Sequence, residues 1–174
     1  MKKKIYLASS WRNTYQPQVY FDLCVAGHEV YDFRNPAPGE TGFSWSSIDP
    51  NWKNWTPKQL KEALQHPLAV KGHCFDQDGM NWCDACVLLL PAGNSAHLEA
   101  GWCAAKGKPT VVYAPEIKDA DLMYKTFELV DAALGYPTFC TEFSEVLDFL
   151  EHSVTLLSLA ESDAKIDHYS RGDR

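Results

Sequence analysis

Three acidic side chains in the middle of the sequence are the first candidates for chemistry. Glu99 stands among small and apolar residues, and Asp76 and Asp78 precede it. Two carboxyl groups in one cleft can divide their roles, one ionised as a nucleophile and the other protonated as an acid. The small neighbours Ala100 and Gly101 would let a ligand approach the backbone, although Glu99 could equally face solvent near a helix start. The sequence alone does not rank Asp76 against Asp78.

The stretch around Glu99 has the pattern of a strand-helix-strand crossover. An apolar run at 85–90 predicts a buried strand, and a helix should follow over 94–106, capped by Asn94-Ser95. A second apolar strand is expected at 110–113. Glu99 then lies in the first helical turn, where the helix dipole and free backbone N–H groups would hold its carboxylate ionised. This position is just beyond the carboxyl end of a parallel strand, where open α/β sheets bind ligands.

The start of the chain has the same expected order of a strand, a helix and a strand. We therefore predict an α/β fold, a flavodoxin-like or Rossmann-like doubly wound sheet of about five parallel strands with helices on both faces. Residues 1–160 should form this single domain and 161–174 a polar C-terminal tail. Asp84, at the start of the third strand, is expected to be structural. The predicted strands outside the crossover are 4–8, 29–33 and 137–140, and the predicted helices are 15–26, 57–64, one within 68–83, 121–134 and 142–159.

The segment 34–57 interrupts this regular pattern. It holds four prolines, two glycines and three tryptophans, and Phe43 and Trp45 are among its aromatic residues. Such an insertion in a compact domain is usually a functional lid or binding loop. Aromatic side chains there could stack on a nucleobase, each contributing about 1–3 kcal/mol. They could equally pack the loop onto the domain or onto a partner subunit, and the two interpretations are compatible.

The overall charge limits the class of partner. Asp and Glu outnumber Lys and Arg by 23 to 16, so the net charge of the 174 residues is −7. This balance argues against a nucleic-acid polymer or an anionic membrane as the main partner, though not against a small nucleotide. No segment approaches the length of a membrane span, and no apolar stretch after the N-terminal Met-Lys-Lys-Lys suits a signal peptide. We expect a cytoplasmic enzyme or small-ligand binder.

Six cysteines include one close pair, Cys83-x-x-Cys86, at the start of the predicted third strand. A zinc site would need a second pair of ligands at matching spacing, and a thioredoxin-type pair would open a helix. We therefore expect buried, reduced thiols and neither a metal nor a redox cofactor.

Several short motifs together resemble the nucleoside 2-deoxyribosyltransferases. The motifs are Tyr6-Leu7-Ala8-Ser9-Ser10 at the end of the first strand, Asp76 eight positions before Asp84, Ser95-Ala96-His97-Leu98-Glu99-Ala100-Gly101, and Gly107-Lys108-Pro109. Related nucleotide N-glycosidases share the pattern, including 2'-deoxynucleoside 5'-phosphate N-hydrolases and pyrimidine nucleotide hydrolases. The resemblance covers roughly residues 4–114.

The resemblance implies a role for several residues. Glu99 matches the nucleophile that attacks C1' of the sugar, Asp76 the acid that helps the base leave, and Tyr6 the tyrosine that positions the nucleophile or sugar. Arg12 falls in the loop that holds the phosphate of the substrate in hydrolase members. Transferase members carry Asp residues where this chain has Gly93, Asn94 and Ser95, so transfer and hydrolysis both stay open. The other residues expected to contact the substrate are Ser9, Phe43, Trp45, Asp78, Gly93 and Ser95.

The function expected from the resemblance is cleavage or transfer of the N-glycosidic bond of a nucleoside or nucleotide, without a cofactor. The alternatives are a TIR-like NAD glycohydrolase and a catalytically silent nucleotide-binding module. The family is homo-oligomeric, and we expect at least a symmetric dimer, with the Phe43–Trp55 loop or the segment 121–134 at or near the interface.

Overall fold

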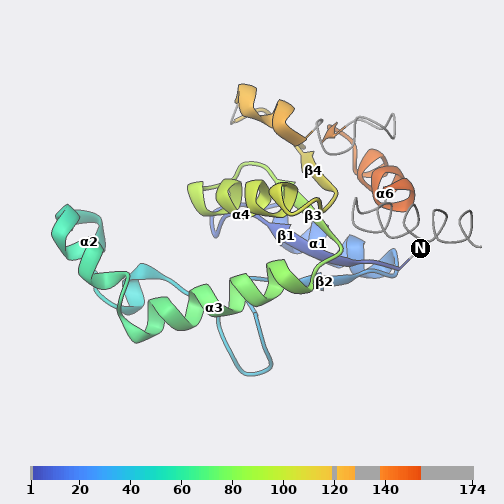
Figure 1. Ribbon diagram of the computed structural model, residues 1–174. Helices are drawn as coiled ribbons and strands as arrows, with labels where there is room; N and C mark the ends of the chain where they lie inside the picture. Colours follow the sequence, from blue (N-terminus) through green and yellow to red (C-terminus); the bar gives the residue numbers. More distant parts are fainter. Residues whose placement is uncertain (1, 119–120, 128–137, 154–174) are drawn as a thin grey trace, which may run out of the picture.

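The computed structural model describes residues 2–118, 121–127 and 138–153, which form a five-stranded sheet (Figure 1). All strand pairs are parallel, and the order is β2-β1-β3-β4-β5. The predicted flavodoxin-like, doubly wound α/β fold is therefore confirmed. The order reverses between β1 and β3, and such a switch point is where open α/β sheets bind ligands. The strands are β1 (Lys4–Ala8), β2 (Glu29–Tyr31), β3 (Ala85–Leu89), β4 (Thr110–Tyr113) and β5 (Phe139–Cys140).

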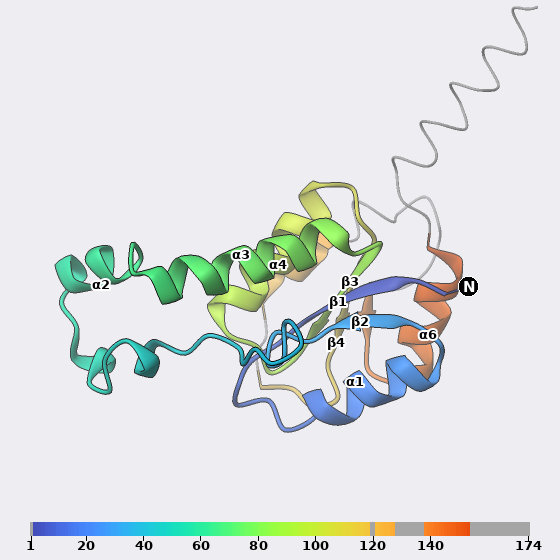
Figure 2. The same ribbon diagram turned by 90° about the horizontal axis from the view of Figure 1, so that it is seen from below.

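Helices cover both faces of the sheet. Figure 2 shows α1 and α6 on one side of the strands, and α4 with the carboxyl half of α3 on the other. Each face has its own core, with Leu23 and Phe149 in one and Met80 and Ala100 in the other. Every residue of β3 is buried, as expected for a strand that is covered on both faces. The helices are α1 (Gln16–Val25), α2 (Pro57–Ala63), α3 (Pro67–Trp82), α4 (Asn94–Ala105) and α6 (Phe143–His152), and the 3₁₀ turns are η1 (Trp45–Ser47), η2 (Trp52–Asn54) and η3 (Leu122–Tyr124).

Residues 43–66 project beyond the carboxyl ends of the strands together with the amino half of α3, and we call residues 43–66 the arm (Figures 1 and 2). A capping box starts α2: Thr56 Oγ1 accepts from the Gln59 backbone N–H at 3.3 Å, and Gln59 Oε1 accepts from the Thr56 N–H at 2.9 Å. Pro57 then occupies the first helical turn, as its fixed φ favours. The predicted helix at 57–64 is thus confirmed.

Lys108, in the turn after α4, fastens the carboxyl end of α3. Its ammonium donates to the carbonyl oxygens of Met80, Asn81 and Cys83 at 2.7, 2.9 and 2.6 Å. These carbonyls belong to the last turn of α3 and the residue after it, and a cation at that end also complements the helix dipole. The two helices on this face of the sheet are therefore tied together at one end.

Pro67 opens α3, so the helix predicted within 68–83 is confirmed, and Asp76 and Asp78 both lie on it. One expectation about local structure was wrong. Gly93 is the N-cap of α4, and Glu99 is its sixth residue, beyond the first turn. Asp84 has the predicted structural role: its carboxylate accepts from the Lys4 N–H at 2.9 Å.

Some predicted segments fall partly or wholly outside the described residues. These segments are 128–134 of the predicted fourth helix, 154–159 of the last helix, and the tail 161–174. In the described ranges, no helix has both the length and the apolar character that crossing a bilayer requires.

Candidate active site

The loops after β1 and β3 are joined at the switch point of the sheet by Asn13. Its side-chain amide donates to the carbonyl oxygens of Leu89 and Pro91 at 3.3 and 3.0 Å. The side-chain oxygen of Asn13 accepts from the backbone N–H groups of Tyr15 and Gln16 at 2.8 and 3.1 Å, at the start of α1. Asn13 is only 2% exposed. One buried amide therefore sets the position of both loops.

Ser9 and Arg34 complete this frame. Ser9 Oγ donates to the Leu89 carbonyl at 3.2 Å. One terminal nitrogen of Arg34 lies 3.1, 3.2 and 3.0 Å from the carbonyl oxygens of Ser10, Trp11 and Asn13. The guanidinium thus holds the loop after β1 in place through main-chain oxygens.

Two carboxyl groups from different helices interact with one another. Glu99 extends from α4 and Asp76 from α3, and both are mostly buried. The Tyr31 hydroxyl donates to Asp76 Oδ1 at 2.9 Å. Tyr31 stacks on Tyr6, with ring centroids 5.0 Å apart and planes 12° from parallel. The two tyrosines are partners across β1 and β2, so the sheet itself sets the stack.

Tyr6 is completely buried, and its hydroxyl makes no hydrogen bond of good geometry among the described residues, although it lies close enough to Glu99 to lower the pKa of that carboxyl. Of the charged groups around it, the carboxyls of Glu99 and Asp76 have the largest effect on its pKa. Burial and these carboxylates raise the pKa of Tyr6, and burial and Asp76 raise the pKa of Tyr31. Both phenols therefore stay protonated and can donate. A buried donor without a well-formed hydrogen bond is costly, and Glu99 is the acceptor on which this hydroxyl acts.

Gly79 makes room for the tyrosine that binds Asp76. A Cβ atom on Gly79 would lie 2.8 Å from ring atoms of Tyr31, closer than side chains can pack. The helix bearing Asp76 can therefore approach β2 only because this residue has no side chain.

Asp76 makes Glu99 harder to ionise. Burial, and then repulsion from Asp76, raises the pKa of Glu99 to about 7, while the Tyr6 hydroxyl opposes the rise. Burial also raises the pKa of Asp76, whereas the Tyr31 hydroxyl and His73 lower it. The expectation that the helix start holds Glu99 ionised was wrong, because Glu99 lies beyond the first turn and in a buried position.

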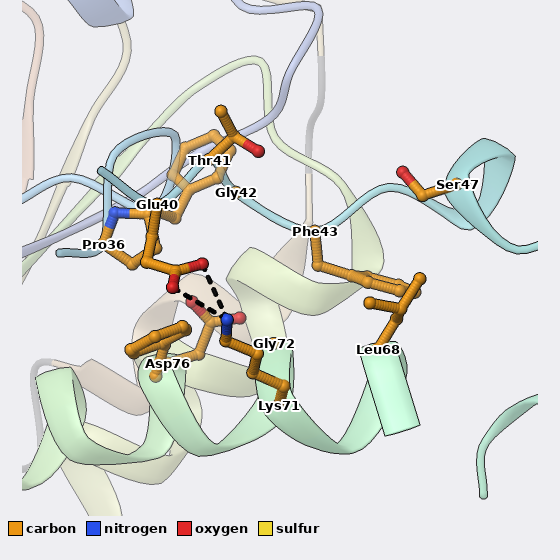
Figure 3. A pocket seen from close by; sticks show the side chains of 12 residues that line it. Pro36, Glu40, Thr41, Gly42, Phe43, Ser47, Leu68, Lys71, Gly72 and Asp76 are labelled. Atoms are coloured by element: carbon orange, nitrogen blue, oxygen red, sulfur yellow. Dashed lines mark hydrogen bonds and ion pairs between the residues drawn. The ribbon is translucent and has the colours of Figure 1, made fainter. Parts of the chain in front are cut away.

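A pocket of about 140 Å³ lies between the segment 33–47 and α3 (Figure 3). It includes Asp76, so it adjoins the carboxyl pair. Three aromatic rings contribute to its walls, and Lys71 and Glu40 form an ion pair at 2.8 Å within the lining. Pockets for drug-sized ligands measure about 300–1,000 Å³, so this one suits a single ring. The lining residues are Phe33, Pro36, Glu40, Thr41, Gly42, Phe43, Ser47, Leu68, Lys71, Gly72, Phe75 and Asp76.

The structure brings together only part of the predicted substrate-binding set. Phe43 lines the pocket, whereas Trp45 packs edge-on between Phe43 and Trp55, with centroids 4.8 and 5.7 Å away. Gly93 caps α4, and its carbonyl accepts from the His97 ring at 2.8 Å. The remaining predicted residues, Arg12, Asp78 and Ser95, are exposed, and Asp78 lies two positions from Asp76 and hence on another side of α3.

Several site residues were missed in the sequence. Tyr31 was part of a correctly placed strand, and pairing that strand with β1 in register would have put it beside Tyr6. Asn13 had no signal beyond its place in a loop. Glu40 and Lys71 are 31 positions apart, and no local pattern joins them.

The cysteine pair lies away from the carboxyl groups. Cys83 and Cys86 are buried free thiols, as expected, and Cys103 lies beside them. A hydrogen bond with Cys103, together with burial, raises the pKa of Cys83, so this thiol is unreactive.

No protein-family model matches the chain, and no curated protein matches its sequence. A solved structure similar to it is a Clostridium botulinum CMP N-glycosidase, BcmB, at 16% identity and a TM-score of 0.44, covering 87% of this chain and 99% of that one. Another is a 2-deoxyribosyltransferase from the psychrotolerant bacterium Bacillus psychrosaccharolyticus, at 20% identity and a TM-score of 0.48, covering 89% and 98%. One fold hosts many activities, so what this chain does is decided by its own site residues.

Proposed function

We propose that this protein cleaves or transfers the N-glycosidic bond of a nucleoside or nucleotide. The observation that carries the proposal is the carboxyl pair of Glu99 and Asp76 beside a pocket the size of one ring, with Tyr31 bonded to Asp76 and stacked on Tyr6. Glycosidic bonds break through an oxocarbenium-like transition state, which needs a carboxylate near C1' and an acid near the leaving group. The motif resemblance assigns the same two roles to the same two residues.

Glu99 and Asp76 titrate as a coupled pair. Because ionising either group opposes ionising the other, one proton is shared over a range of pH. Glu99 has the pKa near 7, and Asp76 is stabilised as a carboxylate by Tyr31, so the proton resides on Glu99 in the free protein. For the reaction it must pass to Asp76, which leaves Glu99 ionised and Asp76 as the acid.

The first chemical step then balances. A Glu99 carboxylate oxygen bonds to C1', the C1'–N bond breaks, and its electron pair leaves with the base nitrogen, which takes the proton of Asp76. In the second step water or another base attacks C1', Asp76 accepts its proton, and the Glu99 ester is released. Tyr6, a protonated donor without a well-formed hydrogen bond, positions Glu99 or the sugar by donating to one of their oxygens.

The carboxyl pair also argues against a silent binding module. Two mutually repelling, mostly buried carboxyl groups cost stability, and a protein that only binds has no use for them. A TIR-like NAD glycohydrolase would also place a Glu at a ribosyl bond, so NAD belongs in the substrate panel.

The test is base release from a panel of nucleosides, nucleotides and NAD, with and without an acceptor base. Glu99→Ala should reduce turnover of the best substrate by at least about a thousandfold, because it removes the covalent route. Asp76→Asn should slow base departure strongly, and Asp78→Asn, two positions away on the same helix, should change it little. Near-normal turnover by Glu99→Ala would falsify the assignment.

A further inference from the structure

We propose that Glu40 and Lys71 form a recognition site for the polar edge of the base, and that this site takes bases with an exocyclic amino group, cytosine or adenine. The inference rests on the proposed function for the identity of the ligand. Its observation is an ion pair built into the wall of a pocket that is otherwise lined largely by rings and apolar side chains.

A defined turn presents Glu40 to the pocket. Its N–H donates to the Ala37 carbonyl at 2.9 Å, and Gly39 before it has φ +79°. Pro38 and Gly39 are the residues that a type II turn favours at its two central positions. Glu40 is therefore held by the backbone rather than by chance on a loose loop, and both of its oxygens lie 2.8 Å from Lys71 Nζ (Figure 3).

The other walls suit a flat ring. Phe33, Phe43 and Phe75 line the pocket, and Figure 3 shows Phe43 extending toward α3. Phe43 reaches this place because Gly72 has no side chain: a Cβ there would lie 2.6 Å from the Phe43 Cβ. Aromatic side chains bind bases through their faces without regard to sequence, so selection has to come from polar groups.

Glu40 and Lys71 can bind a base edge without separating. Each carboxylate oxygen has a second lone pair and the ammonium has three N–H groups, so both keep capacity beyond their mutual bonds. A carboxylate is acceptor-only and matches the amino group of cytosine or adenine. Lys71 then donates to the neighbouring ring nitrogen. A base with a carbonyl in place of the amino group would place its oxygen against the Glu40 carboxylate, and the two acceptors would repel each other.

The position of Asp76 connects this site to the chemistry. Asp76 lines the same pocket, so a ring held against Glu40 and Lys71 lies next to the acid that protonates its leaving nitrogen. The ion pair is not needed for the fold, because half-exposed pairs of this kind contribute little to stability.

The test compares ligands that differ only in the amino group, adenine with purine and cytosine with 2-pyrimidinone. Equilibrium binding of the free bases is measured by ligand-observed NMR, and kcat/KM is measured for the corresponding nucleosides or nucleotides. Glu40→Gln should lower the preference for the amino-bearing ligand by about 10- to 100-fold, the usual effect of a hydrogen bond to a charged group. Lys71→Met should instead weaken binding of both ligands of a pair by a similar factor, because both carry the ring nitrogen to which Lys71 donates. Glu29→Gln is the matched control, because it breaks an exposed 2.8 Å ion pair with Lys2 away from the pocket.

The outcomes separate this inference from the proposed function. A wild-type protein that releases bases while Glu40→Gln keeps its full preference overturns the recognition site and leaves the function standing. Binding of adenine or cytosine that depends on Glu40, without turnover of any substrate, supports the site and rejects the function. Equal binding of each ligand and its amino-free analogue by wild type also overturns the site.

Discussion

Glu99 and Asp76 illustrate how a reactive residue is made by its surroundings. Burial, and then repulsion from Asp76, keeps Glu99 from ionising, and burial also raises the pKa of Asp76. The hydroxyl of Tyr31 then separates the two by favouring the ionised form of Asp76. The difference in environment, rather than in chemistry, gives two carboxyl groups two roles.

Replacing Glu99 by Gln should therefore stabilise the fold at the pH where the wild-type group is charged. The pKa of Glu99 is raised from 4.5 to about 7 in the folded protein, so folding favours the protonated form. The stability of the wild type falls as pH rises from about 4.5 to 7, and the penalty is complete above 7. Urea unfolding at pH 8 should show Glu99→Gln more stable by on the order of 1–3 kcal/mol, with the difference gone at pH 4.

Glu145→Gln is the control for the predicted stability of Glu99→Gln. Glu145, an exposed acid on α6, has a lowered pKa, so Glu145→Gln should destabilise slightly or not at all at pH 8. A Glu99→Gln variant less stable than wild type at pH 8 would show that the carboxylate is paired and not isolated.

Single residues of the site were predictable to different degrees. Glu99 stood out because a carboxylate among alanines and glycines is unusual, and its neighbours were local in sequence. Its ionisation was mispredicted, because burial depends on α3 and β2, which lie far from it in the chain. Tyr6 was found through the motif resemblance, while Tyr31 required knowledge of which strands pair.

At the scale of elements, α3 is shaped by glycines where a helix usually avoids them. Gly72 and Gly79 each face an aromatic side chain from another segment, Phe43 and Tyr31. Glycine in a helix costs about 0.5–1 kcal/mol relative to alanine. What offsets this cost is the close approach of an aromatic side chain to the helix at each glycine. The sequence predicts a helix within 68–83 but does not explain these glycines, whose purpose appears only with the packing partner.

Gly79→Ala should destabilise the protein, against the usual direction for this change in a helix. The new methyl would lie 2.8 Å from the Tyr31 ring and push it from Asp76. We expect a loss of about 1–3 kcal/mol in unfolding free energy and a fall in kcat. Gly101→Ala in α4, where nothing lies within 4 Å, should instead stabilise by about 0.5–1 kcal/mol. Thermal unfolding of the two variants side by side checks the difference in sign.

The strands were the most predictable elements. A strand buried on both faces must be a short apolar run, and each of the five was placed within two residues of its bounds. Helix starts were less certain, because Asn94-Ser95 and Gly93 are all acceptable N-caps and only the path of the preceding loop selects one. The segment 34–57 was predicted as an insertion, but its projection from residue 43 onward together with α2 was not predicted, since no local pattern tells where a loop points.

For the whole molecule, the arm presents apolar surface with no sheet beneath it. Leu60 and Leu64 share one side of α2 and are 43% and 52% exposed, and Leu68 at the start of α3 is 43% exposed. Exposed apolar groups clustered in this way mark contact surfaces. We propose that a second copy packs against the arm, which also would limit the access of water to the adjoining pocket.

Light scattering at micromolar concentration should then give twice the 19.6 kDa mass of the chain. Leu60→Glu with Leu64→Glu should shift the protein to monomer, because two buried charges are costly at an interface. Ile117→Glu, at a site 87% exposed and outside the arm, should leave the mass unchanged. A wild-type mass of 19.6 kDa with activity intact contradicts the dimer.

The hydrogen bonds from Lys108 fix the carboxyl end of α3. Three carbonyl oxygens at its carboxyl end are held by one ammonium, while its amino end carries the arm beyond the carboxyl ends of the strands. Asp76 lies on α3 between these two ends. A second copy bound to the arm would therefore act on the same helix that carries one of the two carboxyl groups.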